Sequence, residues 1–228
     1  KMNSMRLILK NRLLTLLSIN YIAILAFSMI SPASWAVWTA EIIPVVLAFL
    51  LIVLTYQKFQ FSNTAYLFMF VWLFMHTIGA KYTFAEVPFD WFNNLIGSER
   101  NHYDRVAHYS IGFWAYPIAE YLYRKGHGSL VISSLFGLFA MMSVAAAYEI
   151  IEWWYADLAG GDEGIAFLGS QGDIWDAQRD MLCDTLGAVT ALGVFLYKYK
   201  SLKLALINNL LFPPTKQRRI ARTTDADR

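Results

Sequence analysis

Six long apolar stretches dominate this sequence and leave few folds open to it. Each comes close to the ~20 residues that a helix needs to cross the hydrocarbon core of a bilayer. They lie near residues 13–31, 37–56, 65–84, 106–123, 131–155 and 181–199. Only 16% of the residues are charged, where a soluble domain carries about 25%. The sequence therefore predicts an all-α, polytopic membrane bundle of about six transmembrane helices.

The basic residues fall in alternate connections between these stretches, and this pattern predicts the orientation of the chain. Lys58 lies in the second connection, Arg124 and Lys125 lie in the fourth, and both terminal segments are rich in Lys and Arg. Residues 157–180 instead hold six acids against one base, Arg179. Because cytoplasmic loops carry the excess of Lys and Arg, we expect both termini to lie in the cytoplasm.

These boundaries predict three parts: a cytoplasmic tail (1–12), a six-helix domain (13–199) and a basic cytoplasmic tail (200–228). The last part fits either a patch for anionic lipid or nucleic acid, or a solvated tail whose charge only fixes the topology. We favour the solvated tail. The expected partner of the chain is the lipid bilayer, and no nucleic acid is expected.

Seven ionisable residues are expected at one depth, near the periplasmic end of the predicted helices. At ~1.5 Å of rise per residue, five helices bring them to that level: Glu41, His76, His108, Glu149, Glu152, Asp180 and Asp184. Ionisable groups inside a membrane are costly unless they are paired, hydrated or bound to an ion. Their gathering at one level therefore predicts a polar site.

Helical spacing places several of these groups on shared faces. The shared faces pair Asp104 with His108, Glu149 with Glu152, and Asp176 with both Asp180 and Asp184, because residues three or four apart meet on one side of a helix. A stripe of three carboxylates is expected to meet cations, water or a metal rather than lipid. Asp173 and Asp176 have a second interpretation, since either can cap the start of the sixth helix.

Histidine and carboxylate side chains on facing helices are typical of metal sites in helical bundles. We expect a divalent ion such as zinc to be held by His76, His108, Glu149 and Asp180, with an open position for water. The candidate catalytic residues are Asp104, Arg105, Glu152 and Asp184. The alternative is a structural network of ion pairs that holds six helices in register. Residues 157–173 are rich in Gly and acids, but they lack the EF-hand spacing, so calcium is disfavoured there.

Three stretches of the sequence resemble a known family. They are residues 100–112 (Arg-Asn-His-Tyr-Asp-Arg-Val-Ala-His-Tyr-Ser-Ile-Gly), the pair Glu149 and Glu152, and residues 169–187, which begin Gly-Ser-Gln-Gly-Asp-Ile-Trp-Asp. Over about residues 5–199 the chain resembles the YjdF family of uncharacterised bacterial inner-membrane proteins. The resemblance implies an inner-membrane location and brings no activity with it.

A second, more remote similarity is to VanZ-like proteins. It rests on the spacing of Asp104, His108, Glu149, Asp180, Asp184 and Gly187. That family is associated with low-level resistance to glycopeptide antibiotics, has fewer spans, and carries Asn where this chain has Asp184. The similarity implies work at the outer leaflet on an envelope lipid, glycan or peptide.

Two functions remain open from the sequence. In the first, a membrane-embedded metal-dependent hydrolase or transferase, the metal activates water, a carboxylate acts as general base and Arg105 neutralises an anionic head group. In the second, the protein binds or transports an ion or small solute without catalysis. Transport requires broken helices or polar groups near mid-membrane. The inner halves of the six stretches are largely apolar, so we rank transport lower.

Overall fold

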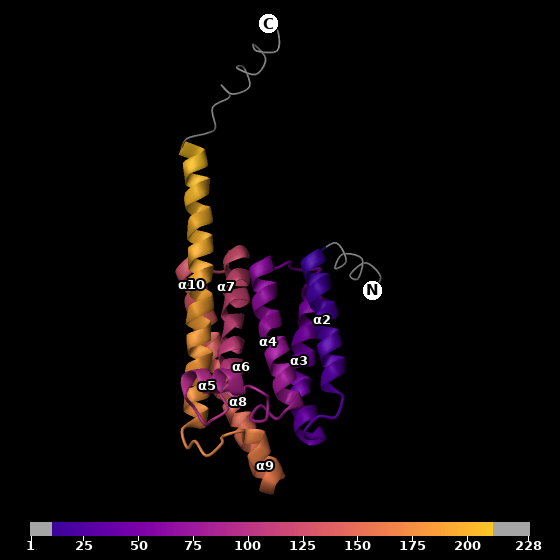
Figure 1. Ribbon diagram of the computed structural model, residues 1–228. Coiled ribbons are helices and arrows are strands. Elements are labelled where there is room, and N and C mark those ends of the chain that lie inside the picture. The colour runs from indigo at the N-terminus through magenta and orange to yellow at the C-terminus, as the bar shows by residue number, and fades with distance from the viewer. Residues whose placement is uncertain (1–10, 212–228) are drawn as a thin grey trace.

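The computed structural model describes residues 11–211, and these are helical with no strand among them, as the sequence predicts. The elements in chain order are α2 (Arg12–Ser28), α3 (Trp35–Thr55), α4 (Asn63–Lys81), α5 (Asp90–Ile96), α6 (Tyr103–Ile111), the 3₁₀ turn η1 (Gly112–Trp114), α7 (Ala115–Arg124), α8 (Leu130–Ala159), α9 (Gly161–Leu168) and α10 (Asp176–Leu211). The long helices run side by side, and the short helices α5 and α9 both lie toward the same end of the bundle (Figure 1).

Four of the long helices begin at a side chain that caps their first turn. The caps are Asn11 for α2, Ser34 for α3, Ser62 for α4 and Ser129 for α8, and each accepts a hydrogen bond from the backbone N–H three residues later. Such caps satisfy backbone donors that have no partner inside the helix. The polar residue that interrupts the apolar pattern therefore fixes where each helix starts.

Three helices of the described chain are long and apolar enough to cross a membrane: α3, α8, and α10 as far as Leu202. Only about a quarter to two-fifths of each span is buried inside the protein. The remaining surface carries large apolar side chains, such as Leu47 and Leu54 on α3 and Phe139 and Ile151 on α8. Exposed apolar surface of this extent requires contact with lipid. The count of six crossings and the orientation of the chain stay predictions.

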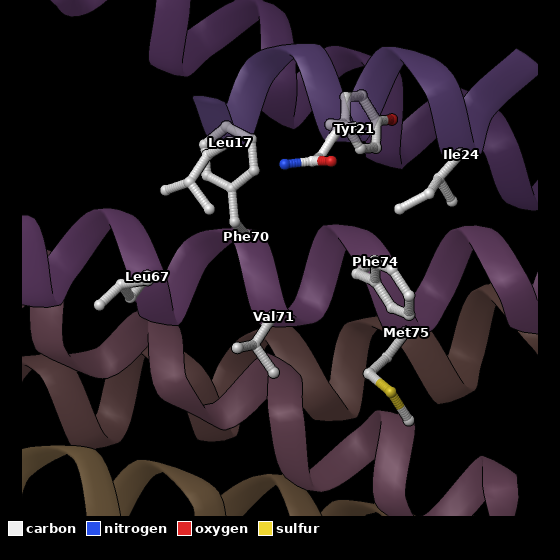
Figure 2. Close-up of a pocket in the computed structure, with 9 residues that line it drawn as sticks. Leu17, Tyr21, Ile24, Leu67, Phe70, Val71, Phe74 and Met75 are labelled. Carbon is white, nitrogen blue, oxygen red and sulfur yellow. The ribbon is translucent and has the colours of Figure 1, made fainter. Parts of the chain in front are cut away.

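The lipid-facing surface is hollowed between α2 and α4. A shallow groove of about 240 Å³ lies there, lined by Leu17, Ile24, Phe70, Phe74 and neighbouring apolar residues. Figure 2 shows these side chains reaching from both helices into the space between them. Apart from Asn20 and Tyr21 the lining is apolar, so the groove suits acyl chains of the surrounding bilayer.

The fourth predicted stretch is not one regular helix. Residues 106–123 were expected to form one span that Pro117 could kink, and the structure divides them among α6, η1 and α7. Pro117 lies in the first turn of α7 and cannot donate a hydrogen bond to Phe113, four residues earlier. The tighter 3₁₀ turn directly before α7 accommodates this missing bond. The interruption matters because every site residue of this stretch lies on α6.

The connection before the last helix also differs from the prediction. Residues 157–173 were expected to be a loop, but α8 continues to Ala159 and α9 follows after a turn at Gly160 and Gly161. Both glycines have positive φ, a conformation that costs other residues free energy. The last helix begins at Asp176, earlier than expected, and passes Tyr199 without a break. Residues 1–10 and 212–228 of the predicted tails lie outside the described part of the chain.

Two glycines bring α10 against α6 and η1. A Cβ atom on Gly187 would lie 1.9 Å from the backbone oxygen of Tyr109, and one on Gly112 would lie 2.1 Å from the backbone oxygen of Asp184. Small residues at a helix crossing let the two backbones touch. This close approach places His108 on α6 directly against Asp184 on α10.

The buried acid Glu120 links several helices at the end of the bundle away from His108 and Asp184. Glu120 on α7 is fully buried and accepts hydrogen bonds from the backbone and hydroxyl of Ser62, both at 2.9 Å. It also pairs with Arg124, four residues later, at 2.7 Å and accepts a hydrogen bond from the Tyr199 hydroxyl at 3.1 Å. A carboxylate at a helix N-terminus is favourable, so Glu120 joins α4, α7 and α10 as a structural clamp.

Candidate functional site

The centre of the polar layer is His108, which lies between two aspartates. Its Nδ1 atom is 3.2 Å from Asp184 Oδ1 on α10, and its Nε2 atom is 3.6 Å from Asp104 Oδ1 one turn earlier on α6. Both aspartates are buried. The predicted shared face of Asp104 and His108 is therefore confirmed. When Nδ1 carries a proton, it donates to Asp184, and Nε2 is the ring nitrogen that faces Asp104.

Asp180 completes a group that matches the donors of a metal site. One ligand atom each from Asp104, His108 and Asp180 lies within 4.8 Å of the other two. A histidine that binds a metal usually donates its second ring N–H to a carboxylate, which fixes the orientation of the ring. Asp184 occupies that position. Two of the four predicted ligands, His108 and Asp180, are thus brought together, with Asp104 as the third member.

Two glutamates of α8 approach this group from the other side. Glu152 lines a small cavity of about 20 Å³, together with His76, Asp104, His108, Tyr148 and Asp184. A cavity of this size holds about one water molecule. Glu149 lies within electrostatic range of His108 and Asp180. Its Oε1 atom is buried and has no hydrogen-bond partner among the described residues. The site therefore has spare oxygen acceptors and room for an ion or a water.

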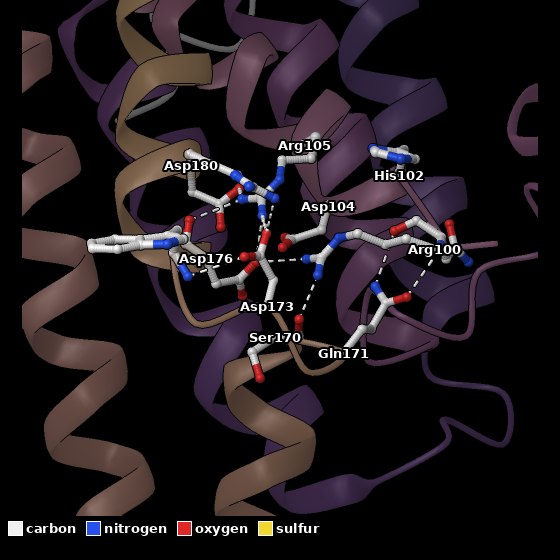
Figure 3. A network of polar contacts seen from close by, with 12 residues as sticks. Arg100, His102, Asp104, Arg105, Ser170, Gln171, Asp173, Asp176 and Asp180 are labelled. Carbon is white, nitrogen blue, oxygen red and sulfur yellow. Dashed lines mark hydrogen bonds and ion pairs between the residues drawn. The ribbon is translucent and has the colours of Figure 1, made fainter. Parts of the chain in front are cut away.

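Arg105 joins α6 to the start of α10. It forms ion pairs with Asp180, with Asp176 at 2.5 Å and with Asp173 at 3.1 Å (Figure 3). Arg105 also donates to the backbone oxygen of Asp176 at 2.9 Å. The predicted carboxylate stripe thus meets cations, as expected. Arg105 was predicted to neutralise an anionic head group, but in this structure three protein carboxylates already surround its guanidinium.

A clasp of polar contacts closes the end of the site. We use this name for residues 98–101 and 170–176, which face each other in Figure 3. Arg100 pairs with Asp176 at 2.6 Å and donates to the backbone oxygen of Ser170. The backbone N–H of Asn101 donates a hydrogen bond to Gln171 Oε1, and Gln171 Nε2 donates one to the backbone oxygen of Asn101. These contacts hold the connection between α9 and α10 over the polar layer.

Asp173 in the clasp and His102 beside it have structural explanations. Asp173 Oδ1 accepts from the Trp175 N–H at 3.0 Å, as expected for a residue that caps the approach to the last helix. Its other oxygen pairs with Arg105 and Arg179. His102 bonds the hydroxyl of Ser98 at 2.8 Å. Burial and the nearby guanidinium groups lower the pKa of His102, so it is neutral at pH 7.

The clasp has a predictable response to acid. The Trp175 N–H, followed by the charges of Arg179, Arg105 and Arg100, lowers the pKa of Asp173 below its usual value. A carboxylate whose pKa is depressed by folding stabilises the protein above its unfolded pKa, near 3.9, and this contribution is lost as the pH falls through the folded pKa. At pH 7 and at pH 5 we expect wild type to have a higher melting temperature than Asp173→Asn, and we expect this difference to disappear only in stronger acid. Thermal unfolding at a series of pH values measures the difference. If the two melting temperatures are equal already at pH 5, or at pH 7, the role of Asp173 is contradicted.

His76 and Glu41 form a separate buried pair. His76 Nε2 lies 2.9 Å from Glu41 Oε2, and the hydroxyl of Tyr148 donates to the same oxygen at 2.5 Å. The pair links α3, α4 and α8. His76 still faces the shared cavity, but it lies outside the group of three described above. Tyr148 was missed by sequence reasoning, although it immediately precedes Glu149 and a buried tyrosine hydroxyl requires a partner.

The geometry defines the class of protein: a helical membrane protein with a buried histidine and carboxylate layer near one end of its bundle. Residues 13–201 match the family described as "Predicted membrane protein (DUF2238)", and the chain belongs to this family. It is similar to the "Inner membrane protein YjdF" of Escherichia coli (strain K12), with 32% identity over 195 residues that cover 84% of this chain and 92% of the relative. No solved structure matches the chain. The chain is thus a multi-pass protein of a bacterial inner membrane, and the similarity to VanZ-like proteins stays a prediction.

Proposed function

We propose that the chain crosses the inner membrane six times with both termini in the cytoplasm, and that its polar layer lies at the periplasmic side. The start of α2 and the end of α10 lie toward the same end of the bundle, as an even number of crossings requires (Figure 1). The polar layer lies toward the other end, near α5 and α9. The distribution of Lys and Arg supports a cytoplasmic location for the end that holds the start of α2 and the end of α10.

We further propose that the site binds one divalent metal ion, zinc being the first choice. The observation that carries this proposal is the group formed by Asp104, His108 and Asp180, with the His108 ring oriented by Asp184. Ligands at ~2.1 Å in a tetrahedral site lie roughly 3.4 Å from one another. Small side-chain shifts bring the three atoms from their present separation to that geometry. Glu149, with its unpaired oxygen, is available as a fourth ligand or as a base.

The catalytic version of this proposal is a metal-dependent hydrolase or transferase. Three protein ligands leave an open position on the metal, where water loses a proton more readily than in bulk. Glu152 lines the cavity beside the group and is placed to act as general base. Asp184 has the position of an orienting residue, because it contacts the far nitrogen of His108. The substrate class that fits the location is an envelope lipid or glycan precursor.

The alternative is a non-enzymatic site that binds or transports an ion or small solute. The observation that favours it is the size of the cavity, about 20 Å³, which admits an ion or a water molecule but no larger substrate. The clasp also covers the site, so a substrate would have to displace it. The two versions differ in whether purified metal-loaded protein hydrolyses a phosphate or acyl ester.

Metal content measured by mass spectrometry on detergent-purified protein tests the shared part of the proposal. We expect about one zinc or similar ion per chain in wild type after dialysis against trace metal. His108→Ala and Asp104→Ala are expected to lose most of it while keeping a helical circular dichroism spectrum. His127→Ala is the matched control, because that histidine is exposed at the opposite end of the bundle. Metal-free wild type, or equal metal in wild type and His108→Ala, contradicts the proposal.

A further inference from the structure

An apolar groove at the end of the bundle away from the polar site has no occupant among the described helices. It has a volume of about 610 Å³, within the ~300–1,000 Å³ of typical ligand pockets. Its walls come from α3, α4, α7 and α8, and include Leu51, Met69, Pro117 and Phe136. Within the bundle α8 packs on α7 and α10, while α3 packs on α4. The groove is the space left between these two halves of the protein.

The mouth of the groove is basic. Lys58 and Phe59, which follow the end of α3, form part of the lining. The guanidinium of Arg124 lies 4.5 Å from the Phe59 ring centre, and the ammonium of Lys125 lies 5.7 Å from it. Arg124 is already bound to Glu120. Lys58 and Lys125 form no ion pair with any acid in the described part of the chain, so their charges are free to meet an anion.

Few polar atoms face the body of the groove. Trp114 lines the groove, and its Nε1 atom is buried with no acceptor among the described residues. A buried indole N–H usually has a hydrogen-bond partner. Away from the mouth, the lining is almost wholly apolar. The groove thus presents charge at its mouth and an apolar body.

We propose that this groove binds an anionic phospholipid. One acyl chain lies between α3 and α8, and the phosphate head group lies between Lys58 and Lys125. Basic pockets between transmembrane helices recognise anionic head groups in this way. With both termini in the cytoplasm, the lipid belongs to the inner leaflet. The site is independent of the metal proposal, because no residue of the polar layer lines it.

Native mass spectrometry of the detergent-purified full chain tests the proposal, with phosphatidylglycerol and phosphatidylcholine as the two probes. We expect wild type to retain one phosphatidylglycerol in preference to phosphatidylcholine. Lys58→Gln and Lys125→Gln are each expected to weaken phosphatidylglycerol binding about fivefold and to leave phosphatidylcholine binding unchanged. Thr55→Trp, which narrows the groove itself, is expected to weaken the binding of both lipids.

Lys198→Gln is the matched control, since this lysine lies at the same end of the bundle but its ammonium bonds Thr64 at 3.2 Å. It is expected to leave both affinities unchanged. Equal retention of the two lipids, or the same loss in Lys198→Gln as in Lys58→Gln, overturns the proposal. A dimer that forms without lipid and is broken by Thr55→Trp also overturns it, because a second copy of the chain would then fill the groove.

Discussion

Replacing Arg105 by methionine is expected to destabilise the folded protein by about 3–5 kcal/mol, the cost of leaving buried charge unpaired. Asp180 is only 3% exposed, and Arg105 is the cation that pairs with it. Asp176 keeps Arg100 as a second partner, so Asp180 bears most of the loss. Methionine retains the apolar length of the arginine stem and removes the charge. Unfolding in detergent, followed by circular dichroism against denaturant or temperature, measures the change.

Arg179→Met is the matched control for this substitution. Arg179 also pairs with Asp173, at 2.6 Å, but its side chain is 58% exposed. Exposed ion pairs contribute about 0–1 kcal/mol, so a small effect is expected. The double variant Arg105→Met/Asp180→Asn removes both members of the buried pair and is expected to recover part of the lost stability. Equal destabilisation by Arg105→Met and Arg179→Met would show that the buried network does not hold α6 to α10.

Gly187→Ala is expected to separate α10 from α6. The free energy of unfolding is expected to fall by about 1–3 kcal/mol or more, as it does when a core is overpacked. The added methyl would lie 1.9 Å from the backbone oxygen of Tyr109. A backbone atom cannot move aside as the end of a side chain can, so the helices themselves must shift. The shift also draws Asp184 away from His108, now 3.2 Å apart. Metal occupancy is therefore expected to fall together with the melting temperature.

Gly193→Ala provides a control on the same helix. A Cβ atom at Gly193 meets nothing within 4 Å. Alanine inside a helix is favoured over glycine by roughly 0.5–1 kcal/mol, so this variant is expected to be unchanged or slightly stabilised. The same chemical change thus has opposite signs at two positions of α10. If Gly187→Ala leaves the stability unchanged, the two backbones are not in contact.

The relations within single helices could be predicted from the sequence. The spacing of Asp104 and His108, and the stripe from Asp176 to Asp184, follow from the helical period and reappear in the structure. Relations between helices could not be predicted in the same way, because they depend on how each helix is rotated and how closely it approaches its neighbours. His76 was grouped with His108, for example, whereas in the structure it pairs with Glu41.

One sequence signal for the close helix approach was present. Gly112 and Gly187 each lie within four residues of a site residue, and small residues of this kind mark close helix crossings in membranes. The break at η1 was harder to foresee, since the sequence shows only that Pro117 disturbs the helix near that point. The apolar groove beside Phe59 arises from four separate helices and has no local pattern.

We propose that His108 on α6 and carboxylates from α6 and α10 converge on one ion. Electron spin echo spectroscopy of the protein loaded with Mn²⁺ tests it most directly, because a bound imidazole nitrogen modulates the echo of the metal. We expect modulation from a single imidazole in wild type and in His76→Ala, and its loss in His108→Ala. Bound Mn²⁺ without nitrogen modulation in wild type, or modulation that survives in His108→Ala, would contradict it.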